Sequence, residues 1–271
     1  MKSYKSYFLD DHPSARAFDV FEPETVSHRI VLFFIHGGGW WSGSRSGEHA
    51  LMWEFSKRGY LCASTDYRLI PEGVGAALTA LDQLSDVRDT YTAFLELARE
   101  KQIEPLPVLF GSSAGAHLAS LMATTQPGEC GEPVTAQAAW MRPAAAVLQS
   151  APFSFEPWPE IFPPILSRIQ NAVGALYVDA PERYKALSLN HHIRPDNPPL
   201  LFLEGACEHI FPAQRNAEIV QQHNAWGIPS QWHIFETAEH GFFYDVTRKP
   251  QQEAFQVMCR FLDDLEHRSL S

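Results

Sequence analysis

Gly111-Ser112-Ser113-Ala114-Gly115 lies between a short apolar run at residues 108–110 and a segment with helical character at residues 114–124. This order predicts a strand, a sharp turn and a helix. A serine at the apex of such a turn adopts a strained backbone conformation, and any Cβ at the two flanking glycines would crowd the turn. We therefore interpret the stretch as a nucleophile elbow that presents Ser113. The GxSxG spacing arises by chance in about one chain of this length in ten, so its surroundings matter.

The rest of the chain alternates between strand-like and helix-like segments. Residues 29–35 give the clearest strand, because Ile30–Ile35 is apolar throughout, as expected for a central parallel strand covered on both faces. Two edge strands are predicted at residues 4–9 and 15–21. Further strands are expected at residues 61–66, 144–149, 200–203 and 231–235, and helices at residues 47–58, 80–100, 212–226 and 250–265. The alternation predicts an α/β fold with one mostly parallel, doubly covered sheet and sites at the carboxyl ends of its strands.

The length and composition predict a single domain that covers residues 1–271. A chain of 271 residues with 45% hydrophobic content can bury one large core. Residues 151–197 differ from their surroundings, because they contain seven prolines and several aromatic residues. Such a segment fits poorly into a sheet or a long helix, so we expect an irregular cap or loop insertion packed over the strand ends.

The charge and the cysteines limit the partners and the location. A formal net charge of −11 argues against nucleic acid or an anionic membrane as a partner, and favours a neutral or cationic small molecule. The four cysteines form no CxxC motif, so buried free thiols in a reducing compartment are expected. Residues 1–11 lack the apolar region of a signal peptide, and no run is long enough to span a membrane. These features predict a cytoplasmic protein.

A serine nucleophile needs a base within hydrogen-bond reach, and the base needs an acid that orients it. His240 is the candidate base, because Glu239-His240-Gly241-Phe242 directly follows the last predicted strand. That is where the chain order serine, acid, histidine places the base. The alternative interpretation of His240 is an ordinary surface-loop histidine.

The acid is expected in the loop after the strand at residues 200–203. Glu208 lies at the apex of that loop, whereas Glu204 is still close to the strand, so Glu208 is the better candidate. Asp179 and Asp196 are rival acids, but both precede the strand and would require a different geometry.

Acyl transfer also requires donors aimed at the oxyanion that develops on the carbonyl group. His36-Gly37-Gly38-Gly39 can supply them, since consecutive glycines let backbone N–H groups turn toward one point, and the N–H of Ala114 lies next to the serine. The alternatives are a plain glycine-rich turn or a phosphate cradle. A cradle is disfavoured because the chain has no GxGxxG or GxxxxGK pattern.

Several motifs together resemble the α/β-hydrolase superfamily, and more narrowly its hormone-sensitive-lipase-like and acetyl-xylan or feruloyl esterase-like carboxylesterases. The resemblance covers residues 29–245. It rests on His36-Gly37-Gly38-Gly39-Trp40, Tyr67-Arg68-Leu69-Ile70-Pro71-Glu72, GSSAG at 111–115 followed by Ala116-His117-Leu118-Ala119, and His240-Gly241-Phe242.

The resemblance implies that Ser113 is the nucleophile and that Gly38, Gly39 and Ala114 form the oxyanion hole. Three features depart from the family pattern, and one of them is Ser112 at the second position of the elbow, next to the nucleophile. The family acid is usually aspartate, whereas Glu208 takes its place here. Only 35 residues precede His36, too few for a large N-terminal cap, so any cap is expected from residues 151–197.

The leading functional hypothesis is a serine esterase for small to medium acyl esters that uses a catalytic triad and no metal or cofactor. The alternatives are an amidase, such as a formamidase resembling the kynurenine type, and a non-catalytic binding module with a hydrolase fold. Aromatic residues near the predicted strand ends can form a substrate pocket or belong to the core. They are Trp40, Trp41, Phe153, Phe155, Trp158, Phe211 and Phe242.

Overall fold

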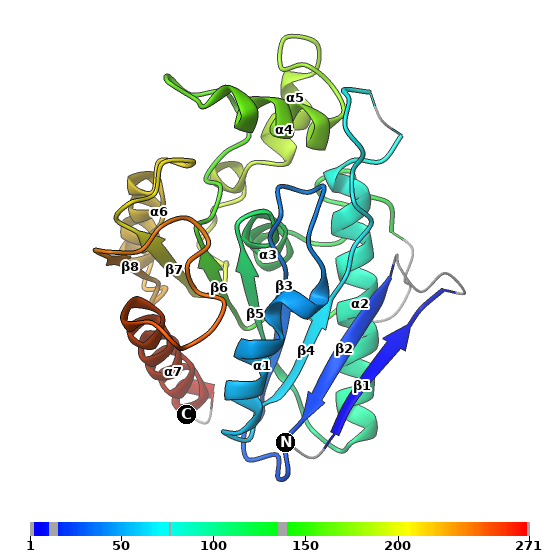
Figure 1. The fold of residues 1–271 in the computed structure, drawn as a ribbon, viewed down its shortest axis with the longest axis vertical. Helices are drawn as coiled ribbons and strands as arrows, with labels where there is room; N and C mark the ends of the chain where they lie inside the picture. Colours follow the sequence, from blue (N-terminus) through cyan, green and yellow to red (C-terminus); the bar gives the residue numbers. More distant parts are fainter. Residues whose placement is uncertain (1–2, 11–15, 76, 135–139, 270–271) are drawn as a thin grey trace.

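A computed structural model describes residues 3–10, 16–75, 77–134 and 140–269. Its centre is a sheet of eight strands in the order β1-β2-β4-β3-β5-β6-β7-β8 (Figure 1). The strands are β1 (Ser3–Phe8), β2 (Ala17–Glu22), β3 (Ile30–Ile35), β4 (Leu61–Thr65), β5 (Leu106–Ser112), β6 (Ala145–Gln149), β7 (Leu200–Gly205) and β8 (Gln231–Phe235). All neighbouring pairs from β4 to β8 are parallel, and only the pairings of β2 are antiparallel. The predicted mostly parallel α/β sheet is confirmed.

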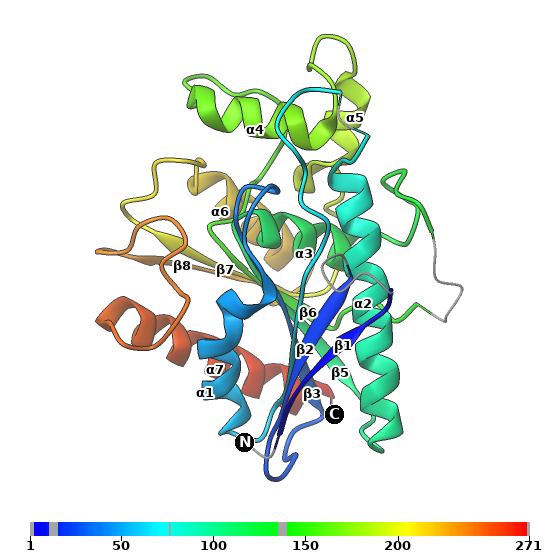
Figure 2. The same cartoon turned by 45° about the vertical axis from the view of Figure 1, so that its right-hand side comes forward.

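Helices cover both faces of this sheet (Figures 1 and 2). One face packs against α2 (Ala80–Glu100), α3 (Ala114–Thr124) and α6 (Gln214–Ala225), and the other against α1 (His49–Ser56) and α7 (Lys249–Ser269). The side chains of β3 alternate between the two cores: Val31 and Phe33 point to the first, and Leu32 and Phe34 to the second. Because both faces are buried, the strand has no polar position, which explains its continuous apolar sequence.

The two N-terminal strands differ from each other. β1 lies at the edge of the sheet as predicted, whereas β2 pairs with β1 on one side and with β4 on the other. The prediction that both are edge strands is therefore wrong for β2, whose Phe18 and Val20 belong to the main core. Ala15, the predicted start of this strand, lies outside the described residues, as do Met1 and Asp11.

The proline-rich segment between β6 and β7 is partly helical, which differs from the predicted irregular structure. It contains α4 (Pro163–Val173), α5 (Pro181–Ala186) and a short 3-10 turn, η2 (Leu189–His191). Pro163 and Pro164 occupy the first positions of α4, where backbone N–H groups have no helical acceptor and proline is well tolerated. The two prolines thus start a helix instead of preventing one. Figures 1 and 2 show α4 and α5 beyond the carboxyl ends of the central strands.

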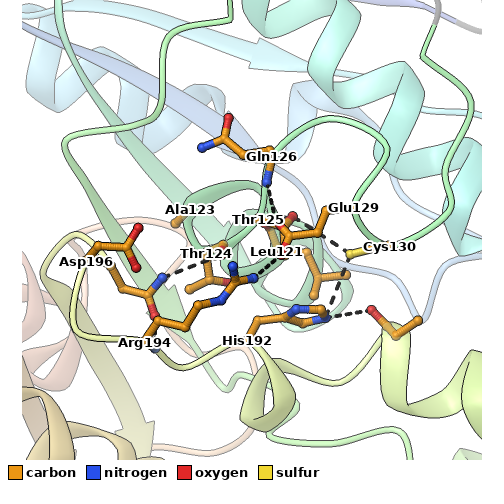
Figure 3. A network of polar contacts seen from close by, with 12 residues as sticks. Leu121, Ala123, Thr124, Thr125, Gln126, Glu129, Cys130, His192, Arg194 and Asp196 are labelled. Carbon is orange, nitrogen blue, oxygen red and sulfur yellow. Dashed lines mark hydrogen bonds and ion pairs between the residues drawn. The ribbon is translucent and has the colours of Figure 1, made fainter.

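A polar network fixes the segment that returns from the cap to β7 (Figure 3). His192 Nε2 lies 2.8 Å from the Ala186 carbonyl oxygen and 3.9 Å from Cys130 Sγ, and Arg194 forms an ion pair with Glu129. Thr125 Oγ1 caps the end of α3 by donating to the Leu121 carbonyl oxygen at 2.6 Å. The segment that leads into β7 is therefore linked to the C-terminal end of α3 and to the loop that follows it.

The cysteines follow the prediction only in part. All four thiols are free, and Cys62 and Cys130 are buried as predicted. Burial raises the pKa of Cys130 to about 12, so this thiol is neutral at physiological pH. Cys207 is exposed and Cys259 is partly exposed, so the prediction of burial is wrong for these two. Cys207 lies in the loop after β7, where its position depends on loop geometry that the surrounding sequence does not reveal.

Within the ranges given above, none of the helices combines the length and the apolar character needed to cross a bilayer. In the same ranges, no group of three or more His, Cys, Asp or Glu side chains is arranged to hold a metal ion.

Candidate active site

Ser113 lies at the sharp turn between β5 and α3. Its backbone has φ 52° and ψ −114°, which is unusual for a residue with a side chain. The flanking glycines permit this turn, because a Cβ on Gly111 would collide with the Gly115 carbonyl oxygen and a Cβ on Gly115 with the Ile35 carbonyl oxygen. This backbone geometry is the one that a nucleophile elbow requires.

Three side chains form a hydrogen-bonded line at the carboxyl ends of β5, β7 and β8. His240 Nε2 lies 2.8 Å from Ser113 Oγ, and His240 Nδ1 lies 2.7 Å from Glu208 Oε2. An ionised carboxylate can only accept, so Nδ1 carries the proton and Nε2 is free to accept from the serine hydroxyl. This tautomer is the one that a general base for Ser113 requires.

Glu208 is held on both of its oxygens. Oε2 accepts from His240, and Oε1 accepts from the N–H groups of Ile210 at 2.7 Å and Phe211 at 3.4 Å. Burial alone raises the pKa of this carboxyl, since its side chain is only 2% exposed, but the His240 and backbone hydrogen bonds outweigh burial. The pKa of Glu208 is therefore below its ordinary value, and the group is a carboxylate at neutral pH.

The other acidic candidates do not reach His240. Glu204 lies within β7 and accepts from Asn216 Nδ2 at 2.8 Å, and burial raises its pKa well above the ordinary value. Burial therefore favours the neutral form of Glu204. Asp196 pairs with Arg142 at 3.1 Å with its side chain 70% exposed, and Asp179 is exposed in the cap.

The glycine loop after β3 turns back on itself beside the elbow. The Gly38 carbonyl oxygen accepts from the N–H groups of Trp41 at 3.2 Å and Ser42 at 3.0 Å, and Gly38 and Gly39 have φ values of 119° and 59°. Such values favour glycine. Among the described residues, no acceptor takes a hydrogen bond from the N–H groups of Gly38, Gly39 or Ala114. Backbone donors without protein partners are uncommon away from bulk solvent, so these three are available to a ligand oxygen.

A cavity of about 310 Å³ opens onto the serine, the histidine and the glycine loop. Ser113, His240, Gly38 and Gly39 form its polar end. The remaining wall includes Trp40, Ile165, Arg168, Ile210 and Phe211. A mostly apolar space with a few convergent polar groups is typical of a small-molecule binding site.

The family follows from a sequence comparison. Residues 18–222 match the family model described as BD-FAE. The chain belongs to the BD-FAE family. This result, with the solved structures described below, confirms the predicted α/β-hydrolase resemblance and fold.

Named relatives of this BD-FAE family member include two proteins of Mycobacterium tuberculosis. A probable carboxylic ester hydrolase, LipM, is 28% identical over 207 residues, which cover 71% of this chain and 44% of LipM. Esterase LipQ is 27% identical over 236 residues, covering 84% of this chain and 53% of LipQ. The chain thus spans about half the length of these curated relatives.

Among solved structures, esterase 2 of Thermogutta terrifontis has a similar fold. Its sarin-phosphonylated form superposes with a TM-score of 0.74 at 23% identity, covering 92% of this chain and 90% of that one. The butyrate-bound form gives a TM-score of 0.72 at 24% identity, covering 92% and 89% of the two chains.

The aromatic residues predicted for the pocket fall into three groups. Trp40 and Phe211 line the cavity with Ser113, and Trp40 also packs against Phe155, which is fully buried. Phe153 and Trp158 line a neighbouring cavity of about 370 Å³, which shares Phe211 with the first.

Trp41 and Phe242 line neither cavity, which differs from the prediction. Trp41 is 46% exposed and stacks against Arg168. Phe242 packs against Phe235 on the opposite side of the sheet, because Gly241 turns the chain with φ 68° just after the histidine. The turn explains why neighbours of His240 in the sequence are separated from it in the fold.

Two supporting residues of the site were missed by the sequence reasoning. Ser150 follows β6 with φ 49°, and its Oγ accepts from the Gly241 N–H at 3.1 Å. Gln149, with its amide oriented to satisfy its neighbours, accepts from the Phe242 N–H at 2.7 Å and donates to Ser112 Oγ at 3.1 Å. Both residues hold the loop that carries His240. They lie at the carboxyl end of β6, and because sites in such sheets form at the carboxyl ends of strands, this position is the sequence signal that could have identified them.

Proposed function

We propose that this chain is a serine carboxylesterase that hydrolyses small to medium acyl esters through an acyl-enzyme on Ser113. The observation that carries the proposal is the hydrogen-bonded line from Ser113 through His240 to Glu208, which opens onto a cavity that also contains free backbone donors. The named relatives support it, since they are described as a carboxylic ester hydrolase and an esterase.

The first half of the reaction would form the acyl-enzyme. His240 Nε2 takes the proton of Ser113 Oγ as the oxygen attacks the ester carbonyl carbon, and the carbonyl electrons move onto oxygen. The N–H groups of Gly38, Gly39 and Ala114 stabilise this oxyanion, while Glu208 stabilises the imidazolium. When the tetrahedral intermediate collapses, the bond to the alcohol oxygen breaks and His240 gives that oxygen its proton.

The second half would release the acid. A water molecule gives its proton to His240 Nε2 and attacks the acyl carbon, and the same backbone donors receive the second oxyanion. Collapse then breaks the bond to Ser113 Oγ, which regains its proton from the imidazolium. Every proton and electron pair is accounted for by the substrate, water and these residues, so the proposal includes no metal or cofactor.

The test of the proposal compares an ester with its matching amide. We expect turnover of an acetyl or butyryl ester with release of the acid, and much slower hydrolysis of the amide, because an amine leaves only after efficient protonation by His240. A preference for the amide would favour the formamidase alternative. No turnover and no covalent labelling of Ser113 would favour the binding module.

The proposed oxyanion role predicts a specific effect of Gly39→Val. A β-branched residue is strained at φ 59°, so the N–H groups of this loop should move away from the oxyanion. We expect kcat to fall by about 100- to 1,000-fold with a much smaller change in KM, because the donors act mainly in the transition state. Steady-state kinetics on a short-chain ester measure both constants.

Gly47→Ala is the control, since Gly47 lies in the short 3-10 helix η1 (Arg45–Glu48) that follows the same loop, and a Cβ there meets no atom within 4 Å. Its kinetics should stay close to those of the wild type. A Gly39→Val enzyme with unchanged kcat and a raised KM would contradict the oxyanion role.

We infer a single domain over residues 1–271 with residues 151–197 as its cap, a small-molecule ester as its partner, and a cytoplasmic location without nucleic acid binding. The free cysteines support the location, and the net charge of −11 supports the absence of nucleic acid binding.

A further inference from the structure

Arg168 carries a permanent positive charge and lines the cavity that contains Ser113. It comes from α4 of the cap, one helical turn after Ile165, and both side chains line the cavity wall opposite the sheet. The sequence reasoning did not predict this residue, and the catalytic steps above do not use it. Its presence in the cavity therefore needs a separate explanation.

The guanidinium is held in a fixed orientation by two other segments. Its Cζ lies 4.0 Å from the centre of the Trp41 ring, and Nη2 donates to Glu72 Oε1 at 2.9 Å. Trp41 belongs to the glycine loop, and Glu72 belongs to the loop after β4, which rises beside the cap helices in Figures 1 and 2. A stacked guanidinium keeps its N–H groups in one plane, where they can bind a second carboxylate.

The ion pair with Glu72 is too exposed to explain the position of Arg168 as a contact that holds α4 in place. The Glu72 side chain is 71% exposed, whereas that of Arg168 is 24% exposed. An ion pair with one partner in solvent contributes little to stability, and water readily replaces the exposed carboxylate. Arg168 is therefore the half-buried and oriented member of the pair, and Glu72 is the replaceable member.

The charges around the cavity favour a negative group at Arg168. Among the described residues that line this cavity, Arg168 is the only side chain with a permanent charge. The nearest acid of the site, Glu208, directs its oxygens to His240 and to the backbone of Ile210 and Phe211. A substrate carboxylate would thus meet one oriented cation and no carboxylate on the cavity wall.

We propose that Arg168 is a specificity residue that selects esters carrying a carboxylate group, an inference that rests on the proposed esterase function. The net charge of −11 predicts repulsion of anions by the protein as a whole, and the sequence reasoning accordingly favoured neutral or cationic substrates. Arg168 reverses that preference locally, because a charge-assisted hydrogen bond acts at contact distance, whereas the distant surface charges are screened by salt.

The test uses two pairs of esters, each with one carboxylate ester and one neutral ester of the same shape. The first pair places the charge on the acyl side: 4-nitrophenyl hydrogen adipate against 4-nitrophenyl 6-methylheptanoate. The second places it on the alcohol side: 4-acetoxybenzoate against 4-isopropylphenyl acetate. For each enzyme, kcat/KM of the charged ester is divided by that of the neutral ester, and the variant's ratio is compared with that of the wild type.

We expect Arg168→Met to lower this ratio by about 10- to 100-fold in one pair, which identifies the side of the ester that carries the carboxylate. Arg168→Lys should retain part of the preference, since it keeps the charge and loses the planar donor edge. Glu72→Gln should raise the ratio, because it removes the carboxylate that competes for the guanidinium.

Arg183→Met is the matched control, because Arg183 is an exposed arginine of α5 outside the cavity. Equal loss of preference in Arg183→Met and Arg168→Met would overturn the inference, since only long-range charge would then matter. An unchanged ratio in Arg168→Met for both pairs would also overturn the inference. The same holds if the charged and the neutral ester of each pair slow equally, because a loosened α4 would then explain the loss of activity. If the wild type hydrolysed none of the four esters, the proposed function itself would fail.

Discussion

Ser113→Ala should lower kcat on a short-chain ester by roughly four to six orders of magnitude and abolish covalent labelling by an organophosphonate probe. The expected loss is this large because Ser113 Oγ is the atom that forms the acyl bond in the proposed mechanism, and His240 then has no hydroxyl proton to accept. Intact mass measurement after incubation with the probe reports labelling independently of turnover.

Ser112→Ala is the matched control for this experiment. Ser112 is the last residue of β5 and lies beside the elbow, but its Oγ contacts the Gln149 amide instead of His240. This variant should still be labelled and should keep most of its activity, since the nucleophile and its base are unchanged. Labelling that persists in Ser113→Ala and disappears in Ser112→Ala would show that Ser112 is the nucleophile and that the assignment to Ser113 is wrong.

Most of the sheet can be predicted from the sequence, because strands and helices are marked by patterns within short stretches of the chain. The boundaries of α2, α3 and β8 match the predicted ranges. In α2 the apolar residues recur at helical spacing, and α3 follows directly after the GxSxG turn. Ser113, Glu208 and His240 could be chosen for a related reason. In a parallel sheet the carboxyl ends of the strands share one edge, so residues that directly follow β5, β7 and β8 must lie close together.

Residues positioned by tertiary contacts could not be predicted in this way. Arg168 reaches the cavity only because α4 crosses over the strand ends, and two prolines had suggested an irregular segment at the start of that helix. Phe242 was expected in the pocket because it is near His240 in sequence, but the Gly241 turn directs it into the core on the far side of the sheet. Both outcomes depend on the path of the chain, which short-range patterns do not encode.

Glu208→Gln should lower kcat by roughly two to four orders of magnitude while the fold is retained. The geometry explains the size of the effect. The amide oxygen is expected to keep the position that accepts from the Ile210 and Phe211 N–H groups, which turns the amide NH₂ group toward His240 Nδ1. A donor there forces Nδ1 to be the acceptor and moves the ring proton to Nε2, which then cannot take the proton of Ser113.

Three comparisons separate this effect from a general loss of structure. Glu208→Asp should lose less activity, because the charge remains and only one methylene of reach is lost. Glu204→Gln should stay within a few-fold of the wild type, since Glu204 accepts from Asn216 and not from His240, and burial favours its neutral form, which glutamine resembles in shape. Asp179→Asn and Asp196→Asn should be nearly silent, as both side chains are exposed in or beside the cap. If one of these aspartates proved costly and Glu208→Gln mild, the acid would come from residues 151–197, and the cap would be part of the catalytic machinery.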